Sequence, residues 1–175
     1  MSHIEARNVG NAIFIRLGDR SGSRAGIVKN IHIQDLYCEV PFGRPDIDYD
    51  LRGPEVNFFH NPFPSSITGI PGHPVENVLL KNITIVYPGR ASKGMAYLPL
   101  SRLKDIPELE KSYPEFSMFG ELPAWGFFVR HVKNIIFHNV KLKLKDKDFR
   151  PAYVFKDVGG CRFEQTNTRS IYREP

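Results

Sequence analysis

Four basic residues recur at related positions along the chain, and together they could hold an anion. They are Arg16, His73, Arg130 and Lys156. The last three each stand five residues before a short hydrophobic repeat. Arg16 holds the equivalent position before the repeat that begins at Ile31, if the glycine-rich turn after Arg16 is counted as a longer bend. If the repeats stack, these side chains form a ladder with rungs about 4.8 Å apart. The sequence leaves two interpretations open: a basic stripe that faces a polyanion, or solvated polar positions on an outer face.

A second candidate site contains a carboxylate between aromatic residues. Glu121 lies beside Phe119 and Trp125 in the sequence. An aromatic ring can stack on a sugar ring while a carboxylate accepts a hydrogen bond from a hydroxyl. A packed loop is the alternative, and we favour it over a sugar site.

Three alternating acidic residues, Asp46, Asp48 and Asp50, would share one face of an extended segment and could bind a cation through oxygen ligands. Their spacing is not that of a calcium loop, and prolines interrupt the segment. A solvated or hydrogen-bonded loop is therefore the favoured interpretation. The sequence predicts no metal site and no cofactor.

A repeat organises the positions of these residues. The pattern is hydrophobic, any, hydrophobic, any, Asn or Asp, hydrophobic, and its five copies begin at Ile4, Ile31, Val78, Ile135 and Cys161. Alternating apolar residues indicate strands with one buried face. An earlier strand is predicted in each unit, near residues 12–17, 66–69, 126–130 and 152–156. Asn30, Asn77 and Asn134 precede three copies; asparagine tolerates a left-handed bend and can hydrogen-bond to stacked copies of itself.

The repeat predicts an all-β fold, a parallel β-helix of about five coils with a unit of about 26 residues. Two long loops interrupt it, at residues 41–65 and 89–124, and the second contains a helical candidate over residues 105–111, with Pro107 in its first turn. We expect one domain over residues 1–175. In this register Cys38 and Cys161 lie roughly 14 Å apart, beyond the limit of about 7 Å for a disulfide, so both thiols are expected to be free.

Composition excludes several classes of protein. The chain has 175 residues, 41% of them hydrophobic and 25% charged, which suits a buried core, and no apolar run is long enough to span a membrane. The net charge of +5 permits an acidic partner. The basic residues are dispersed and no nucleic-acid-binding motif occurs, so neither a nucleic acid nor a membrane is an expected partner. No signal peptide opens the sequence, which leaves the localisation of this chain unknown.

Four segments carry a resemblance to a known family. NVGNAIFIRLGDR, HNPFPSSITGIPGHPVENVLLKNITIVYPG, YPEFSMFGELPAWGFFVRHVKNIIFHNVKL and RPAYVF resemble the C-terminal part of bacterial polygalacturonase-like enzymes of glycoside hydrolase family 28. The resemblance covers nearly the whole chain. It implies a right-handed parallel β-helix, secreted or periplasmic in full-length relatives, and inverting hydrolysis of glycosidic bonds in pectic polysaccharides.

The family's motifs run in the order Asn-Thr-Asp, Asp-Asp, Gly-His-Gly and Arg-Ile-Lys. The first three do not occur here, and the last has the counterpart Arg16-Leu17-Gly18, with glycine at the lysine position. By resemblance, Arg16 grips a substrate carboxylate or hydroxyl, while the missing lysine puts a galacturonate preference in doubt. Gly72-His73-Pro74 follows the arginine motif rather than preceding it, so it is not the family's histidine motif.

The resemblance therefore predicts a segment of a hydrolase that contains no catalytic residues and is inactive alone, and whether the chain is itself an enzyme stays open. The expected substrate-binding residues are Arg16, His73, Arg130, Lys156, Glu121 and Trp125, and the expected partner is a pectic or other plant polysaccharide. The alternative is a non-catalytic fragment that binds carbohydrate or self-associates. The first repeat begins within four residues of Met1, which leaves no room for a cap, so either a homo-oligomer through that end or poor solubility is expected.

Overall fold

The computed structural model describes residues 2–22, 25–42, 61–94, 98–167 and 170–174. As predicted, the fold is all-β, and one 3-10 helix, η1, is the helical element of the described part. The strands are β1 (Ser2–Arg7), β2 (Phe14–Arg16), β3 (Lys29–Glu39), β4 (Ser65–Thr68), β5 (Val75–Tyr87), β6 (Phe127–Leu144), β7 (Tyr153–Glu164) and β8 (Ile171–Arg173). None of the described helices is long and apolar enough to cross a membrane.

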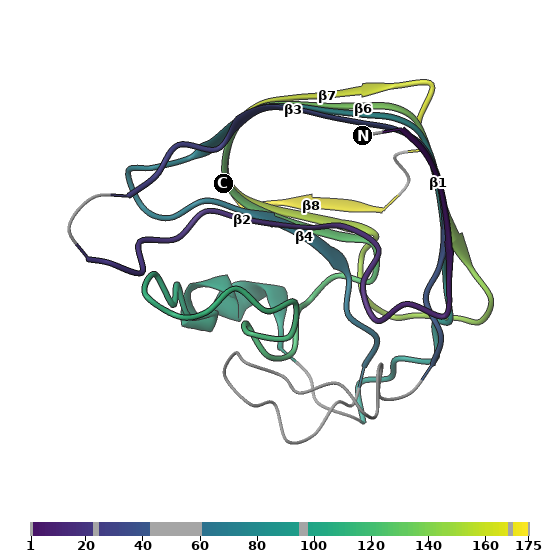
Figure 1. Cartoon of the computed structure of the whole chain (residues 1–175). Helices are drawn as coiled ribbons and strands as arrows, with labels where there is room; N and C mark the ends of the chain where they lie inside the picture. Colours follow the sequence, from purple (N-terminus) through teal and green to yellow (C-terminus); the bar gives the residue numbers. More distant parts are fainter. Residues whose placement is uncertain (1, 23–24, 43–60, 95–97, 168–169, 175) are drawn as a thin grey trace.

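All strand pairs are parallel, and the sheet curls into a half-barrel (Figure 1). Two stacks of strands form its walls: β1, β3, β5, β6 and β7 on one side, and β2, β4, β6, β7 and β8 on the other. Strands β6 and β7 belong to both stacks because each is long and bends. The first residues of β6 pair with β4, and those from Val132 onward pair with β5.

The register confirms four of the five repeat copies. Ile31 pairs with Val78, Val78 with Ile135, and Ile135 with Cys161. The placement of the first copy was wrong, because Ile4 pairs with Leu36 instead of Ile31. The left-handed bend accounts for the difference: His3 (φ 55°), between the paired Ser2 and Ile4, lies opposite Asp35 (φ 55°), where the pattern placed Asn8. The ion pair of Arg7 with Glu39 accompanies the observed register.

The predicted asparagine ladder is present at the first bend of the wall formed by β1, β3, β5, β6 and β7. Asn30, Asn77 and Asn134 have φ values of 59°, 54° and 59°. The side-chain amide of Asn77 donates to Oδ1 of Asn30 (3.0 Å), and that of Asn134 donates to Oδ1 of Asn77 (3.1 Å). Gly160 continues the row with φ 71°. The hydrogen bonds between the side-chain amides offset part of the cost of the left-handed backbone, which is about 1–2 kcal/mol per residue.

A second ladder lies five residues further along the same strands. Asp35, Asn82 and Asn139 have φ values of 55°, 54° and 51°. The amide of Asn82 donates to Asp35 (2.9 Å), and the amide of Asn139 donates to Asn82 (2.9 Å). These positions are the Asn or Asp of the repeat pattern, which explains why the pattern requires a short polar residue there.

The hollow of the curled sheet is filled at the β7 end by an aromatic cluster. The rings of Phe137 and Phe163 stack with centroids 5.0 Å apart, and those of Phe127 and Tyr153 stack at 5.9 Å. Phe127 and Phe137 are fully buried. Burial of such a side chain contributes about 1.5–3 kcal/mol, so this cluster anchors the strands that carry the site described below.

Residues 98–122, here called the cover segment, lie against the outer face of the β2, β4, β6 and β7 wall (Figure 1). Its short helix is η1 (Leu100–Asp105), which ends at the residue where the predicted helix begins, so Pro107 lies outside the helix. Leu103, Ile106 and Phe119 of the cover segment are buried in a second apolar cluster with Phe128 and Val154 of the wall. This packing fixes the cover segment on the sheet.

Both cysteines are free, as predicted. Cys38 is buried in the hollow of the sheet and Cys161 is partly buried.

Candidate functional site

Three of the four predicted basic residues share one row across the second wall. Arg16 of β2, Arg130 of β6 and Lys156 of β7 are in register, and Thr68 of β4 stands between Arg16 and Arg130. The placement of His73 in this ladder was wrong. His73 is exposed in a tight turn closed by hydrogen bonds between its backbone and that of Ile70. The turn lengthens the bend before β5, so counting five residues back from the repeat does not reach the row.

The two arginines of the row bind the backbone of the cover segment. Their guanidinium groups donate hydrogen bonds to four consecutive carbonyl oxygens, those of Ile106, Pro107, Glu108 and Leu109. Arg130 binds the first two, at 2.9 Å each, and Arg16 binds the last two, at 2.8 and 3.2 Å. Arg16 also donates to the carbonyl of Gly69 at 2.9 Å. The row therefore fastens the chain's own loop to the sheet.

The surroundings of Arg130 fit neither of the two interpretations of the ladder, a solvated outer face or a stripe that faces a polyanion. Its side chain is 0% exposed, so it is neither solvated nor facing a polyanion. Burial lowers the pKa of Arg130 to about 10, against the opposing effect of Glu108. The charge of Arg130 is stabilised by the Glu108 carboxylate, 3.2 Å from Nη1 of the guanidinium group, and by the ring of Phe119, whose centroid lies 5.1 Å away. Arg16 lies over the same ring at 5.6 Å.

A cluster of titratable groups lies next to the basic row. On β6 and β7, His131 and Asp157 directly follow Arg130 and Lys156 in the sequence. His131 and Asp157 adopt left-handed backbone conformations, with φ 52° and 51°. The His131 imidazole contacts the Asp157 carboxylate through Nδ1 (2.6 Å) and the Glu108 carboxylate through Nε2 (3.2 Å). The three side chains come from β6, β7 and the cover segment, so the cluster joins all three elements.

The electrostatics of this cluster favour its charged form. Burial alone would lower the pKa of His131, but its hydrogen bonds to Glu108 and Asp157 outweigh burial and raise the pKa above the usual value. Burial alone would raise the pKa of Glu108, and the hydrogen bond to His131 together with the Arg130 charge lowers it. Both shifts favour a charged pair of His131 and Glu108.

This geometry does not match an inverting glycosidase pair. Such a pair leaves room for a water and the sugar between the two carboxyl groups. Here the His131 ring contacts Glu108 on one side and Asp157 on the other, and so fills that space. Within the described ranges, no group of three or more His, Cys, Asp or Glu side chains could hold a metal ion.

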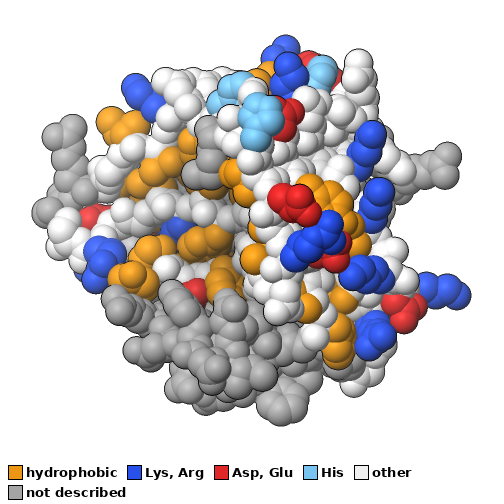
Figure 2. Space-filling model, turned by 45° about the vertical axis from the view of Figure 1, so that its right-hand side comes forward, with side chains coloured by type: hydrophobic (Ala, Val, Ile, Leu, Met, Phe, Trp, Pro, Cys, Tyr) orange, Lys and Arg blue, Asp and Glu red, His pale blue; other side chains and the backbone are white. Residues whose placement is uncertain are grey.

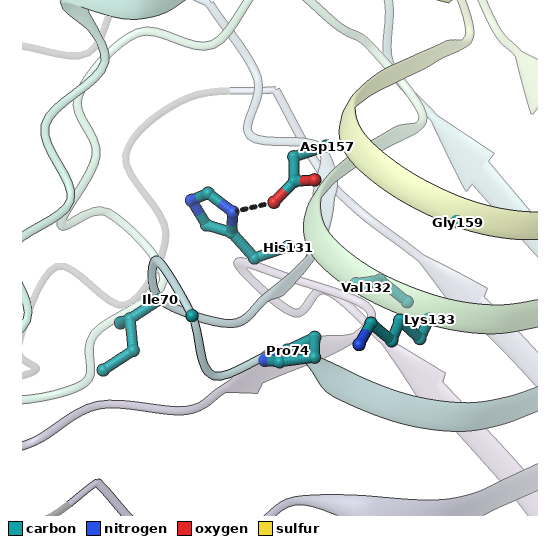
Figure 3. Close-up of a pocket in the computed structure, with 8 residues that line it drawn as sticks. Ile70, Pro74, His131, Val132, Lys133, Asp157 and Gly159 are labelled. Atoms are coloured by element: carbon teal, nitrogen blue, oxygen red, sulfur yellow. Dashed lines mark hydrogen bonds and ion pairs between the residues drawn. The ribbon is translucent and has the colours of Figure 1, made fainter.

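A pocket of about 210 Å³ opens beside the cluster. It lies between the turn that contains Gly72 and Pro74 and the bends of β6 and β7. Figure 3 shows the paired His131 and Asp157 on one side of it and Lys133 on the other. This site was not predicted from the sequence. The available signal was that His131 and Asp157 each directly follow a basic residue of the predicted ladder.

The Glu121 candidate is part of a packed loop. Trp125 is 9% exposed, and its ring contacts that of Tyr87 edge to face, with centroids 5.7 Å apart. Glu121 accepts a hydrogen bond from the side-chain amide of Asn61 (3.1 Å). Phe119 is buried against the two arginines. The interpretation of this segment as a packed loop accounts for all these contacts.

The third acidic group, Asp46, Asp48 and Asp50, lies outside the described residues.

An apolar groove of about 420 Å³ marks the β1 and β2 end of the stack. Aliphatic side chains line it, among them Ile4, Ala6, Ile13, Ile15, Ile31 and Ile33. Figure 2 shows hydrophobic side chains exposed in the hollow of the sheet in this region. Such an exposed apolar surface marks an interaction site or an aggregation risk.

No protein-family model, curated protein or solved structure matches the chain. Its function is therefore argued from the residues and their arrangement.

Proposed function

We propose that the chain is a right-handed parallel β-helix and forms the C-terminal part of a polygalacturonase-like glycoside hydrolase. In this proposal the whole enzyme hydrolyses glycosidic bonds of a pectic polysaccharide with inversion, at catalytic motifs that do not occur in this sequence. The observation that carries the proposal is the pair of ladders, at Asn30 and at Asp35, which repeat a bend on successive parallel strands. Repetition of one unit that contacts only its neighbours is the defining property of a solenoid.

The contacts of the arginine row support a non-catalytic role for this chain within the enzyme. Arg16 is the residue that matches the family's arginine motif, and its guanidinium group donates to carbonyls of the cover segment. We propose that the row holds the cover segment as a fixed wall beside the polysaccharide. Arg16, Lys156 and Glu121 remain candidates for substrate contact at the margins of that wall.

A reducing-sugar assay tests the hydrolase proposal. The chain alone and the chain joined at its N-terminus to a segment with the three missing motifs are incubated with polygalacturonate and with neutral pectic side chains. We expect no product from the chain alone and product from the joined protein. The matched control replaces the joined protein's Asp-Asp motif with Asn-Asn and should abolish activity. Activity of the chain alone would contradict the proposal and direct attention to Glu121 or the Asp46 to Asp50 group.

The apolar groove favours a second candidate, self-association through β1. Outward-facing Glu5 and Arg7 alternate on this strand, so two antiparallel copies centred on Ala6 would place each Glu5 opposite the other copy's Arg7. The inward-facing Ile4 and Ala6 would extend the apolar groove across the two copies. Light scattering after size-exclusion chromatography should show a dimer that Ala6→Pro dissociates. A stable monomer at high concentration would rule this candidate out.

A further inference from the structure

We propose that the pocket beside His131 and Asp157 binds a hydroxylated carboxylate about the size of one sugar unit. Its volume of about 210 Å³ lies below the range of about 300–1,000 Å³ that drug-sized ligands need. The ligand is therefore a single compact unit. The site is separate from the hydrolase proposal, since it requires no bond to be cleaved and uses none of the family's motifs.

One residue of the pocket is a glycine that the backbone conformation does not require. Gly159 lies in β7 and lines the pocket, and it does not have a positive φ. A Cβ added to it would meet no atom within 4 Å. Glycine within a strand weakens it, and often marks a place where a ligand or another backbone approaches closely. Since no described part of the chain fills the space, the missing side chain keeps the pocket open.

Lys133 supplies recognition of an anionic group. It is the residue of β6 that pairs with Gly159, and its side chain extends along the pocket toward Pro74 (Figure 3). The side chain is exposed, and no ion pair joins it to any residue that the structure describes. An ammonium group in this position donates charge-assisted hydrogen bonds to a carboxylate.

Asp157 supplies recognition of hydroxyl groups on the opposite side. Its Oδ2 contacts His131, while 73% of the side chain is exposed toward the pocket and solvent. An ionised carboxylate accepts several hydrogen bonds at once, so Asp157 can retain His131 and also accept from the ligand's hydroxyls. His131 is a positioning residue, held from behind by Glu108. A cation on one side and an acceptor on the other select a ligand with both a carboxylate and hydroxyls.

Isothermal titration of the full chain tests the site. The probes are galacturonate, its neutral counterpart galactose, and trigalacturonate. We expect saturable binding of galacturonate and at least tenfold weaker binding of galactose. Equal affinity for galactose, or no binding of galacturonate, would overturn the proposal. Tighter binding of trigalacturonate would identify a polymer end as the source of the ligand, and equal binding would identify the free acid.

Two variants separate the pocket from the rest of the molecule. Gly159→Val fills the open space with a residue that favours strands, so the melting temperature should stay the same or rise while affinity falls at least tenfold. Its matched control is Gly26→Val, outside the pocket, where the new Cβ would meet only the Leu17 side chain at 3.8 Å. That variant should bind normally.

Lys133→Met provides a second test. It does not depend on whether β7 folds normally with valine at position 159, because Lys133 is an exposed residue of β6. It should lose galacturonate binding, and Lys133→Arg should keep most of it. Normal binding by a folded Gly159→Val or Lys133→Met variant would overturn the site. Neither result bears on the reducing-sugar assay, so failure of the site and failure of the hydrolase proposal are distinguishable.

Discussion

The guanidinium group of Arg130 and the carboxylate of Glu108 form an ion pair, with Nη1 and Oε1 3.2 Å apart, in which the arginine side chain is completely buried. Arg130 lies on β6 and Glu108 on the cover segment, so the pair joins the sheet to the loop that covers it. Its burial makes the arginine a structural residue in a position where the sequence suggested a surface stripe.

Replacement of Arg130 should therefore destabilise the protein strongly. Arg130→Ala leaves Glu108 and two backbone carbonyls without their buried partner, and breaking such a pair costs about 3–5 kcal/mol. Urea unfolding followed by circular dichroism measures the loss. The control is Arg90→Ala, which removes an exposed ion pair with Asp146 and should cost less than about 1 kcal/mol. Equal effects of the two variants would contradict the buried role.

The cluster at His131 makes stability depend on pH. The raised pKa of His131 means that its contribution is fully present below the ordinary value of 6.5 and is lost as the pH rises through the folded-state pKa. The lowered pKa of Glu108 acts in the opposite range: its contribution is present above 4.5 and is lost as the pH falls through the folded-state value.

The urea midpoint should therefore fall on the alkaline side of pH 6.5 and again on the acidic side of pH 4.5. His131→Gln keeps a hydrogen-bonding side chain but removes the charge, so the alkaline fall should disappear in this variant. A His131→Gln protein with an unchanged alkaline profile would assign the effect to other groups.

Asn77 tests the ladder because it both donates to Asn30 and accepts from Asn134. Asn77→Ala loses both hydrogen bonds and places a Cβ without compensation at φ 54°, which should cost about 1–2 kcal/mol from the backbone alone. Asn77→Gly loses the same hydrogen bonds but tolerates the backbone, so it should be the more stable of the two variants. Thermal unfolding gives the order, and the reverse order would exclude backbone strain as the main cause.

Titration of the thiols tests the cysteine assignment. Unreduced, denatured protein should give two thiols, because Cys38 and Cys161 are both free. In the native protein both should react slowly, since burial raises the pKa of each thiol to about 11. A return of no thiols from denatured protein would contradict the observed register.

Local periodicity explains which features could be predicted from the sequence. Alternating apolar residues identified the repeat copies that begin at Ile31, Val78, Ile135 and Cys161, which lie within β3, β5, β6 and β7, and asparagines at fixed offsets identified the bends in these strands. Periodicity does not fix bend length, which is why His73 was misplaced. The burial of Arg130 depends on how residues 98–122 fold back onto the sheet, and that packing follows no repeat. The pocket at Gly159 arises from the same kind of non-local contact.

The hydrogen bonds from Arg16 and Arg130 end on carbonyl oxygens, which every amino acid possesses. These hydrogen bonds thus recognise the path of the cover segment, whereas the ion pair of Arg130 with Glu108 depends on a side chain. Substitutions at Glu110, which is exposed, can alter the outer surface of this loop while the carbonyl hydrogen bonds to the sheet are preserved. The molecule therefore combines a fixed anchorage with a surface whose chemistry is free to diversify.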